Sequence, residues 1–225
     1  MNALTICVNY GDYLALTLPH NRQYFDRYLV VTDHEDLETP AICRANEVEY
    51  HQTSAFYGHG QAFAKGAALK EGIEVLGLDG WTTILDADIA IPLQFWAVVY
   101  SEDSLPKDMI FGPQEKCHCQ KKEVGSNIHN NGTSCAGFLQ VFHGPSYERN
   151  VGIDHPSTTG HCGLDDILFS RCFPRVGYFD FKVCHLGPVP KSGKANADWK
   201  GRVSDKCPFE AKDVPILAGP CTREF

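Results

Sequence analysis

The sequence predicts one mixed α/β domain whose sheet is mostly parallel and is flanked by helices. Short apolar runs rich in β-branched residues alternate with helical patterns over the first ninety residues, which is typical of parallel strands joined by crossover helices. The chain has 225 residues, of which 43% are hydrophobic, so it can bury one large core. No repeat or linker divides it. We therefore expect a single Rossmann-like domain over residues 1–225, with an irregular tail after Pro188.

The N-terminal half is expected to supply four strands and two helices. The strands are predicted at residues 4–10, 27–36, 46–53 and 81–92. The first helix follows the turn at Gly11 and covers residues 11–25. The second covers residues 60–77, because alanine, leucine and phenylalanine recur there at helical spacing and Gly77 stands near its end.

The C-terminal half is less regular. Strands are predicted at 108–114 and 135–144, with two short strands within 175–188. A helix that opens with two aspartates is predicted at 163–173, and the polar segment 116–134 is predicted to be a loop.

Charge is divided unevenly along the chain. The net charge is -8; residues 1–103 hold fifteen acidic and five basic residues (5 − 15 = −10), and residues 104–225 hold thirteen and fifteen (15 − 13 = +2). The acidic half is a poor nucleic-acid surface, whereas the second half could form one locally or could be a solvated face. There is no run of eighteen apolar residues and no basic leader, so we expect no membrane span and a reducing cytoplasm.

Ten cysteines are many for that compartment, and their spacing is irregular. Cys7 and Cys184 lie in apolar strand-like runs and are predicted to be buried thiols. A denser group could supply a structural zinc site, although its spacing matches no zinc signature and unligated cysteines are the alternative. That group comprises Cys117, His118, Cys119, His129, Cys135, His161 and Cys162.

The stretch WTTILDADIAIP (81–92) ends an apolar strand in Asp86 and Asp88. Ligands of open α/β sheets bind at the carboxyl ends of the strands, and two carboxylates at that edge can share a hard divalent cation with a diphosphate. The alternative is a strand end with two solvated aspartates. The pair therefore indicates Mn²⁺ or Mg²⁺ beside a phosphorylated ligand.

Several further motifs resemble those of GT-A fold glycosyltransferases, in particular compact enzymes of phages and bacteria. FAKGAALKEGI (63–73) is similar to the family's helix with a Lys-Gly pair, and CAGFLQVFH (135–143) to its sugar-facing strand. GLDDILF (163–169) is similar to the acidic start of its acceptor helix. VCHLGPVPKSGKANADWKGR (183–202) resembles its closing His-Leu-Gly segment, although its longer spacer leaves the alignment of Asn196 uncertain. The resemblance covers roughly residues 4–202.

The resemblance implies a role for each metal-site residue. Asp88 is expected to ligate the cation directly, and Asp86 to hold the ribose, the cation or a metal-bound water. His185 matches the family's C-terminal histidine ligand; the alternative is an ordinary histidine at a strand end.

The acceptor hydroxyl needs a general base, and Asp165 and Asp166 are the candidates. We prefer Asp165; helix capping is the alternative use of either aspartate. A base on the face opposite the leaving group implies inversion at the anomeric carbon.

The nucleotide is expected over the first strands. Its predicted contacts are the turn Asn9, Tyr10 and Gly11, then Asp33, Lys65 and Asp86, and the tail residues Lys194, Trp199 and Arg202. The tail is expected to fold over the diphosphate as a lid, with a solvated terminus as the alternative.

Together these observations predict a metal-dependent glycosyltransferase that uses a nucleoside-diphosphate sugar, with UDP as the first choice. Residues 1–103 would bind the donor, and 104–225 the acceptor. The acceptor could be hydroxymethyl-pyrimidine DNA of a phage, in the host cytoplasm, or a glycan, a protein or a small molecule. Two other readings remain: a sugar nucleotidyltransferase, and a zinc-stabilised nucleic-acid-binding module.

Overall fold

The structure is a computed structural model of the chain. The structure describes residues 1–60, 63–99, 105–119, 123–126, 135–151, 162–188 and 206–217. The predicted site residues Lys194, Trp199 and Arg202 lie outside these ranges, as do His129 and His161.

A single nine-stranded sheet forms the centre of the molecule, in the order β3-β2-β1-β4-β8-β6-β9-β5, with β7 beside β6. The strands are β1 (Asn2–Ile6), β2 (Arg27–Asp33), β3 (Glu49–Thr53), β4 (Trp81–Asp86), β5 (Ile89–Ala90), β6 (Met109–His118), β7 (Glu123–Ser126), β8 (Leu139–His143) and β9 (Arg175–His185). The first four are parallel, as predicted, and the long β6–β9 ladder is parallel too. Antiparallel ladders join β8, β5 and β7 to them.

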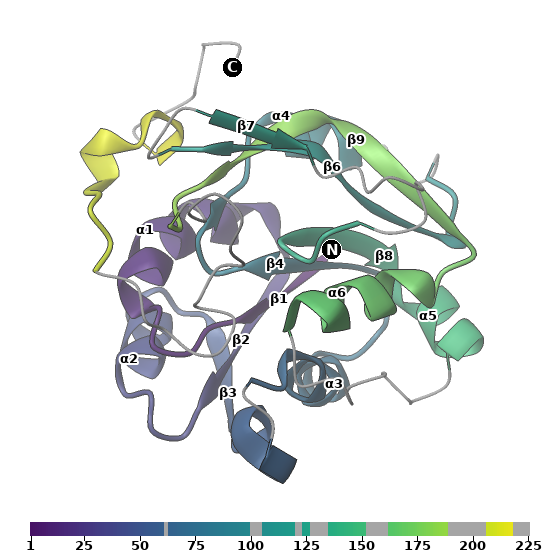
Figure 1. The fold of residues 1–225 in the computed structure, drawn as a ribbon, viewed down its shortest axis with the longest axis horizontal. Coiled ribbons are helices and arrows are strands. Elements are labelled where there is room, and N and C mark those ends of the chain that lie inside the picture. Colours follow the sequence, from purple (N-terminus) through teal and green to yellow (C-terminus); the bar gives the residue numbers. More distant parts are fainter. Residues whose placement is uncertain are drawn as a thin grey trace.

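Helices cover both faces of the sheet (Figure 1). One face carries α1 (Gly11–Asn21), α2 (Glu38–Ala45) and α4 (Gln94–Val99); the other carries α3 (Lys65–Leu76), α5 (Gly144–Val151) and α6 (Cys162–Arg171). Gly77, with a φ of 80°, ends α3 at the predicted place. The expected single α/β domain is confirmed.

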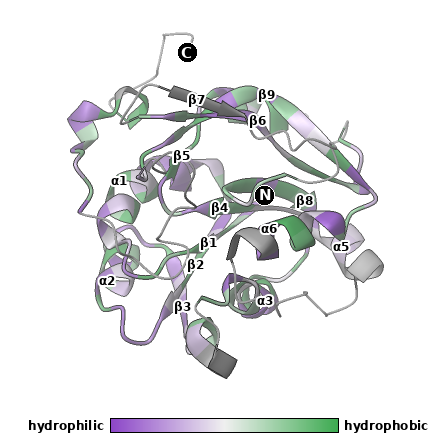
Figure 2. Ribbon diagram, viewed as in Figure 1, coloured by the Kyte–Doolittle hydropathy of each residue, from purple (hydrophilic) through white to green (hydrophobic). Residues whose placement is uncertain are grey.

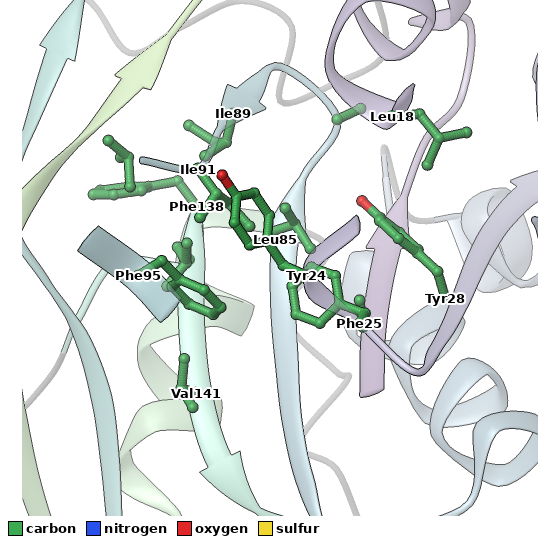
Figure 3. Close-up of a cluster of buried hydrophobic side chains, with 14 of the residues drawn as sticks. Leu18, Tyr24, Phe25, Tyr28, Leu85, Ile89, Ile91, Phe95, Phe138 and Val141 are labelled. Carbon is green, nitrogen blue, oxygen red and sulfur yellow. The ribbon is translucent and has the colours of Figure 1, made fainter. Parts of the chain in front are cut away.

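Two apolar clusters, one on each face, form the core. The first packs α1 and α4 against β4 and β8, and Figure 3 shows Tyr24, Phe25 and Phe95 in contact at its centre. The second packs α3, α5 and α6 on the opposite face, with Phe142, Tyr147 and Phe169 in mutual contact. In Figure 2 the central strands are largely hydrophobic, and hydrophilic residues gather on the outer helices and turns.

Several element predictions were wrong. Residues 175–185 form one strand, because exposed Asp180 alternates with buried Phe179 and Phe181 and so lies on the outer face instead of marking a break. The predicted loop at 116–134 begins instead with the end of β6, which pairs with β9 and β7. Helices α2, α4 and α5 were not predicted, and residues 55–60 form a separate 3₁₀ turn before α3.

The predicted strand 81–92 is broken after Asp86. Ala87 and Asp88 form a turn, and the chain resumes as β5, which lies at the far end of the strand order from β4. The sheet must therefore curl so that both ends of this turn stay connected. β5 pairs antiparallel with β9, and Leu186 N–H donates to the Asp88 carbonyl at 2.9 Å. The curl thus brings the end of β9 beside Asp88.

The C-terminal described segment, residues 206–217, packs against α1. Cys207 N–H donates to Asp12 Oδ2 at 2.7 Å. Val214 and Ile216 are buried in a third apolar cluster with Tyr13 and Leu186. This segment therefore supports the end of β9 from outside.

Candidate active site

Asp88 lies in the turn after β4 and is the most buried carboxylate of the predicted pair, with 7% of the residue exposed. Its Oδ2 is 3.3 Å from His185 Nε2. Within the described residues, its Oδ1 has no hydrogen-bond partner. A Cβ at Gly187 would overlap the Asp88 carboxylate, so the observed position of that carboxylate depends on a glycine there. The His-Leu-Gly segment therefore meets Asp88 through both its histidine and its glycine.

Side chains of α1 hold the backbone around this turn. Thr17 Oγ1 donates to the Ala87 carbonyl at 2.6 Å. Asn21 donates to the Ile89 carbonyl at 2.7 Å and accepts from Ile91 N–H at 3.0 Å. Both polar side chains are buried in an apolar cluster, where each bond is costly to lose. The sequence pattern did not indicate that Thr17 and Asn21 bind this backbone, because it predicts only that the segment is an amphipathic helix.

The end of β6 provides a second wall. His118 Nδ1 lies 3.1 Å from His185 Nδ1. Lys116 is two residues earlier on the same strand and places its ammonium 4.8 Å from the centre of the Phe138 ring. From the sequence, Lys116 and His118 were expected in a polar loop, with His118 as a candidate zinc ligand, because their pairing with β9 is not visible locally.

Burial shifts the pKa values of both Asp88 and His185. It raises the pKa of the Asp88 carboxyl, and the neighbouring charge of Asp86 raises it further. Burial holds the pKa of His185 well below its ordinary value, with the Lys116 charge acting in the same direction. His185 is therefore a neutral imidazole near pH 7, which is the form that binds metals.

Lys65 joins two of the predicted acidic residues. Its ammonium, at the start of α3, is 2.8 Å from Asp86 Oδ1 and 2.9 Å from Asp166 Oδ1. Burial raises the pKa of the Asp166 carboxyl, and Lys65 opposes that shift. A Cβ at Gly137 would overlap Asp166, so this glycine gives the carboxylate its place. The strand, the Lys-Gly helix and the Asp-Asp helix thus converge at Lys65.

Asp165 has a different environment from Asp166. It is fully buried, and its Oδ2 accepts from the Gly66 N–H at 3.1 Å. A carboxylate at the first turn of α3 accepts a hydrogen bond from a backbone amide that has no partner within the helix. The positive end of the helix dipole also stabilises its negative charge. Asp165 therefore caps α3 from α6, the helix-capping use that the sequence offered as the alternative to a general base.

The predicted nucleotide contacts lie at the ends of β1 and β2. Asn9 has a φ of 56° and donates its N–H to Asp36 Oδ2 at 2.8 Å. Asp33 accepts from Glu35 N–H at 2.9 Å. A Cβ at Gly11 would overlap Glu38 at the start of α2. The loop after β1 is therefore held tightly against the loop after β2.

Asp36 is the residue that organises these two loops, and the sequence analysis missed it. Its carboxylate accepts from the N–H groups of Asn9, Glu38 and Thr39 and from the hydroxyls of Thr32 and Thr39. The signal was an aspartate two residues before a helix, which the unpredicted α2 concealed.

The cysteine predictions fail in one respect. Cys184 forms a disulfide with Cys119, so it is not a free thiol. The bridge also removes Cys119 from any zinc site. Cys7 is a buried free thiol, as predicted.

The donor set was tested against the implied metals. Among the described residues, no group of three or more histidine, cysteine, aspartate or glutamate side chains is arranged to hold a metal ion. Structural zinc therefore has no support. A catalytic Mn²⁺ or Mg²⁺ needs fewer protein ligands, because substrate phosphates and water complete its shell. The buried, unpartnered Asp88 Oδ1 beside the neutral His185 fits such an ion.

Comparison with solved structures supports this fold. The chain superimposes on the mannosyltransferase PcManGT from Pyrobaculum calidifontis, in complex with GDP-Man and Mn²⁺, with a TM-score of 0.60 and 14% identity, over 85% of this chain and 57% of that one. For GalNAc-T7 with UDP, GalNAc and Mn²⁺, the TM-score is 0.55 and the sequence identity 12%, over 82% of this chain and 43% of that one. For a 4-diphosphocytidyl-2C-methyl-D-erythritol synthase, the TM-score is 0.50 and the sequence identity 12%, over 80% of this chain and 88% of that one.

These similarities show a fold of the GT-A type. The chain spans a little over half the length of the mannosyltransferase and less than half that of GalNAc-T7. A search of protein-family models finds no match, and no curated protein matches the sequence. In the described ranges, no helix is both long and apolar enough to cross a membrane.

Proposed function

We propose that the protein transfers a sugar from a nucleoside-diphosphate sugar to an acceptor hydroxyl in a metal-dependent reaction. The observation that carries this proposal is the convergence of Asp88 and His185 with the Lys65–Asp86–Asp166 network at the end of β4. Two proteins of similar fold were crystallised with Mn²⁺ and with GDP-Man or UDP, which supports the same donor class.

Asp88 Oδ1 and His185 Nε2 would hold the cation, and Asp86 would hold the ribose or a metal-bound water. When bound, the cation supplies Lewis-acid neutralisation of the leaving diphosphate. Lys116 adds a positive charge on the same side, because Asp88 and Asp86 both favour its charged form although burial lowers its pKa. The loops at Asn9–Gly11 and Asp33 are the proposed site of the nucleoside.

Asp166 is the proposed general base. In the transfer, the bond from the anomeric carbon to the phosphate oxygen breaks, the acceptor oxygen bonds to that carbon, and Asp166 takes the hydroxyl proton. A carboxylate with a raised pKa is a stronger base than an exposed one. With the base opposite the leaving group, the anomeric carbon inverts. The tail with Lys194, Trp199 and Arg202 remains the proposed cover of the diphosphate.

The test is release of nucleoside diphosphate from a panel of UDP- and GDP-sugars with Mn²⁺. We expect activity in the wild type and in D108N, whose carboxylate belongs to an exposed pair with Arg175. We expect a loss of at least about 100-fold in D88N, because the cation is no longer neutralised by a carboxylate. A fully active D88N would overturn the assignment.

The sugar nucleotidyltransferase remains the second candidate, since a diphosphocytidyl-compound synthase shares the fold. That reaction consumes a nucleoside triphosphate and releases pyrophosphate. The loop after β1 carries no basic residue from Val8 to Leu14, which disfavours binding of a triphosphate there. Pyrophosphate release from a triphosphate and a sugar phosphate would favour this candidate.

The acceptor is a separate question. Hydroxymethyl-pyrimidine DNA was predicted from the basic second half, but much of that half lies outside the described residues. The same assay with and without this DNA tests it. Release stimulated by the DNA would identify the acceptor, whereas release that ignores it would direct the search to glycans, proteins and small molecules.

A further inference from the structure

His118 and His185 form a buried histidine pair behind the proposed cation position. They are partners in the parallel β6–β9 ladder, where His118 lies opposite His185. Both are more than nine-tenths buried. Their rings meet edge to face with centroids 4.7 Å apart, and the two Nδ1 atoms are 3.1 Å apart. The opposite nitrogen of His185 faces Asp88.

The nitrogen-to-nitrogen contact restricts where the hydrogens are. A neutral imidazole carries one N–H, so one Nδ1 must donate and the other must accept. If His118 donates, the hydrogen of His185 is on Nε2, and that atom cannot bind a cation. If His185 donates, its Nε2 presents a lone pair toward Asp88. Only the second arrangement is compatible with a cation held between Asp88 and His185.

We propose that His118 is a positioning residue that accepts a hydrogen bond from His185 Nδ1–H and thereby aims the Nε2 lone pair at the cation. The proposal rests on the metal site of the proposed function. Metal-binding histidines generally donate the N–H of their second ring nitrogen to a carboxylate, a carbonyl or water. Loss of that partner lowers the affinity for the metal. Here a second imidazole would take that role.

The surroundings hold the pair in register. The Cys119–Cys184 disulfide links the two strands at the residues that follow and precede the histidines. Cys119 N–H donates to the His185 carbonyl at 3.0 Å. The backbone around both rings is thus fixed from two sides, which leaves the rings little freedom to separate.

Mn²⁺ binding, followed by the electron paramagnetic resonance signal of the free ion, tests the proposal without any substrate. H118F keeps a ring of similar volume but cannot accept, and we expect about 10- to 100-fold weaker binding. H118N should stay close to the wild type, because its Oδ1 can accept near the position of Nδ1. C117S is the matched control, since Cys117 is a free thiol on the same strand.

The outcomes separate the two proposals. If the wild type binds no Mn²⁺, the metal site of the proposed function is wrong, and this inference falls with it. If the wild type binds and H118F binds equally well, only the inference is overturned. Equal weakening in H118N and H118F would also overturn it, since the acceptor atom would then be irrelevant.

A second measurement needs no substrate and leaves both His118 and His185 in place. Nitrogen-15 NMR of labelled histidines distinguishes the two neutral tautomers, and Zn²⁺ serves as a diamagnetic ion. H51Q assigns a distant histidine as a reference. We expect His185 to carry its hydrogen on Nδ1 and His118 on Nε2 in the Zn²⁺-loaded protein. A His118 that carries its hydrogen on Nδ1 in that state would contradict the proposal.

Discussion

The environment of Asp88 is unfavourable for the charged form of its carboxyl. The residue is buried beside Asp86, and both effects raise the pKa of its carboxyl. The pKa is therefore higher in the folded chain than in the unfolded chain. It follows that the contribution of this group to stability is fully present below the unfolded pKa and is lost as the pH rises through the folded one. A bound cation would offset this cost.

Replacement of Asp88 by asparagine should therefore stabilise the metal-free protein near pH 8. We expect the free energy of unfolding to rise by about 1–3 kcal/mol, and the gain to vanish near pH 4, where both forms are neutral. Urea titrations at the two pH values measure it, with D108N as the surface control. Added Mn²⁺ should stabilise the wild type but not D88N. A D88N protein less stable than the wild type at pH 8 would contradict this account.

Gly187 is the second residue that the geometry makes decisive. A methyl group there would overlap the Asp88 carboxylate, whereas a Cβ at Gly80 would meet nothing within 4 Å. G187A should displace Asp88 and weaken Mn²⁺ binding by about tenfold or more, because ligand geometry is lost. G80A should bind as the wild type does. The comparison of the two Mn²⁺ titrations decides it; equal affinities would show that Asp88 has room to move.

At the scale of elements, α1 holds the turn that carries Asp88. Asn21 pairs with both the Ile89 carbonyl and the Ile91 N–H, and it is fully buried. The helix therefore acts on the site through backbone atoms, whose identity no sequence pattern reveals. The same holds for Asp165, which caps α3 from α6 and so fixes Lys65 next to Asp86.

Asn21→Ala should leave two buried backbone groups without partners. We expect a loss of about 2–4 kcal/mol in the free energy of unfolding, because each orphaned group costs about 1–3 kcal/mol, together with weaker Mn²⁺ binding. Q23A is the control, since the Gln23 side chain is exposed and bonds only at the surface. If N21A and Q23A have the same free energy of unfolding, the turn around Asp88 is held by other contacts.

At the scale of the whole molecule, the segment 206–217 connects the end of the chain to the site. Ile216 is 4% exposed and packs in the cluster that contains Leu186, the neighbour of Gly187. The end of β9 is therefore supported by a segment that the sequence predicted to be irregular and gave no packing role.

Ile216→Ala should lower the free energy of unfolding by about 2–4 kcal/mol through the buried cavity it leaves. Leu37→Ala is the matched control, because Leu37 is 79% exposed and its truncation removes no buried contact. Both are measured by urea unfolding. If the free energy of unfolding falls no more in I216A than in L37A, the C-terminal segment does not support the core.

The sequence by itself determined the four parallel strands of the N-terminal half, apart from the break after Asp86. It also determined helix α3 with its stop at Gly77, and the position of Asp86 and Asp88 at the carboxyl end of β4. These follow from local periodicity and from the rule for ligand sites in α/β sheets. The tertiary structure alone decided which distant residues meet. Lys65 between Asp86 and Asp166 and Asp165 at the start of α3 depend on how α3 and α6 pack beside the end of β4. His118 meets His185 because β6 pairs with β9. Such contacts join residues dozens of positions apart, because packing and strand order, not neighbouring residues, set them.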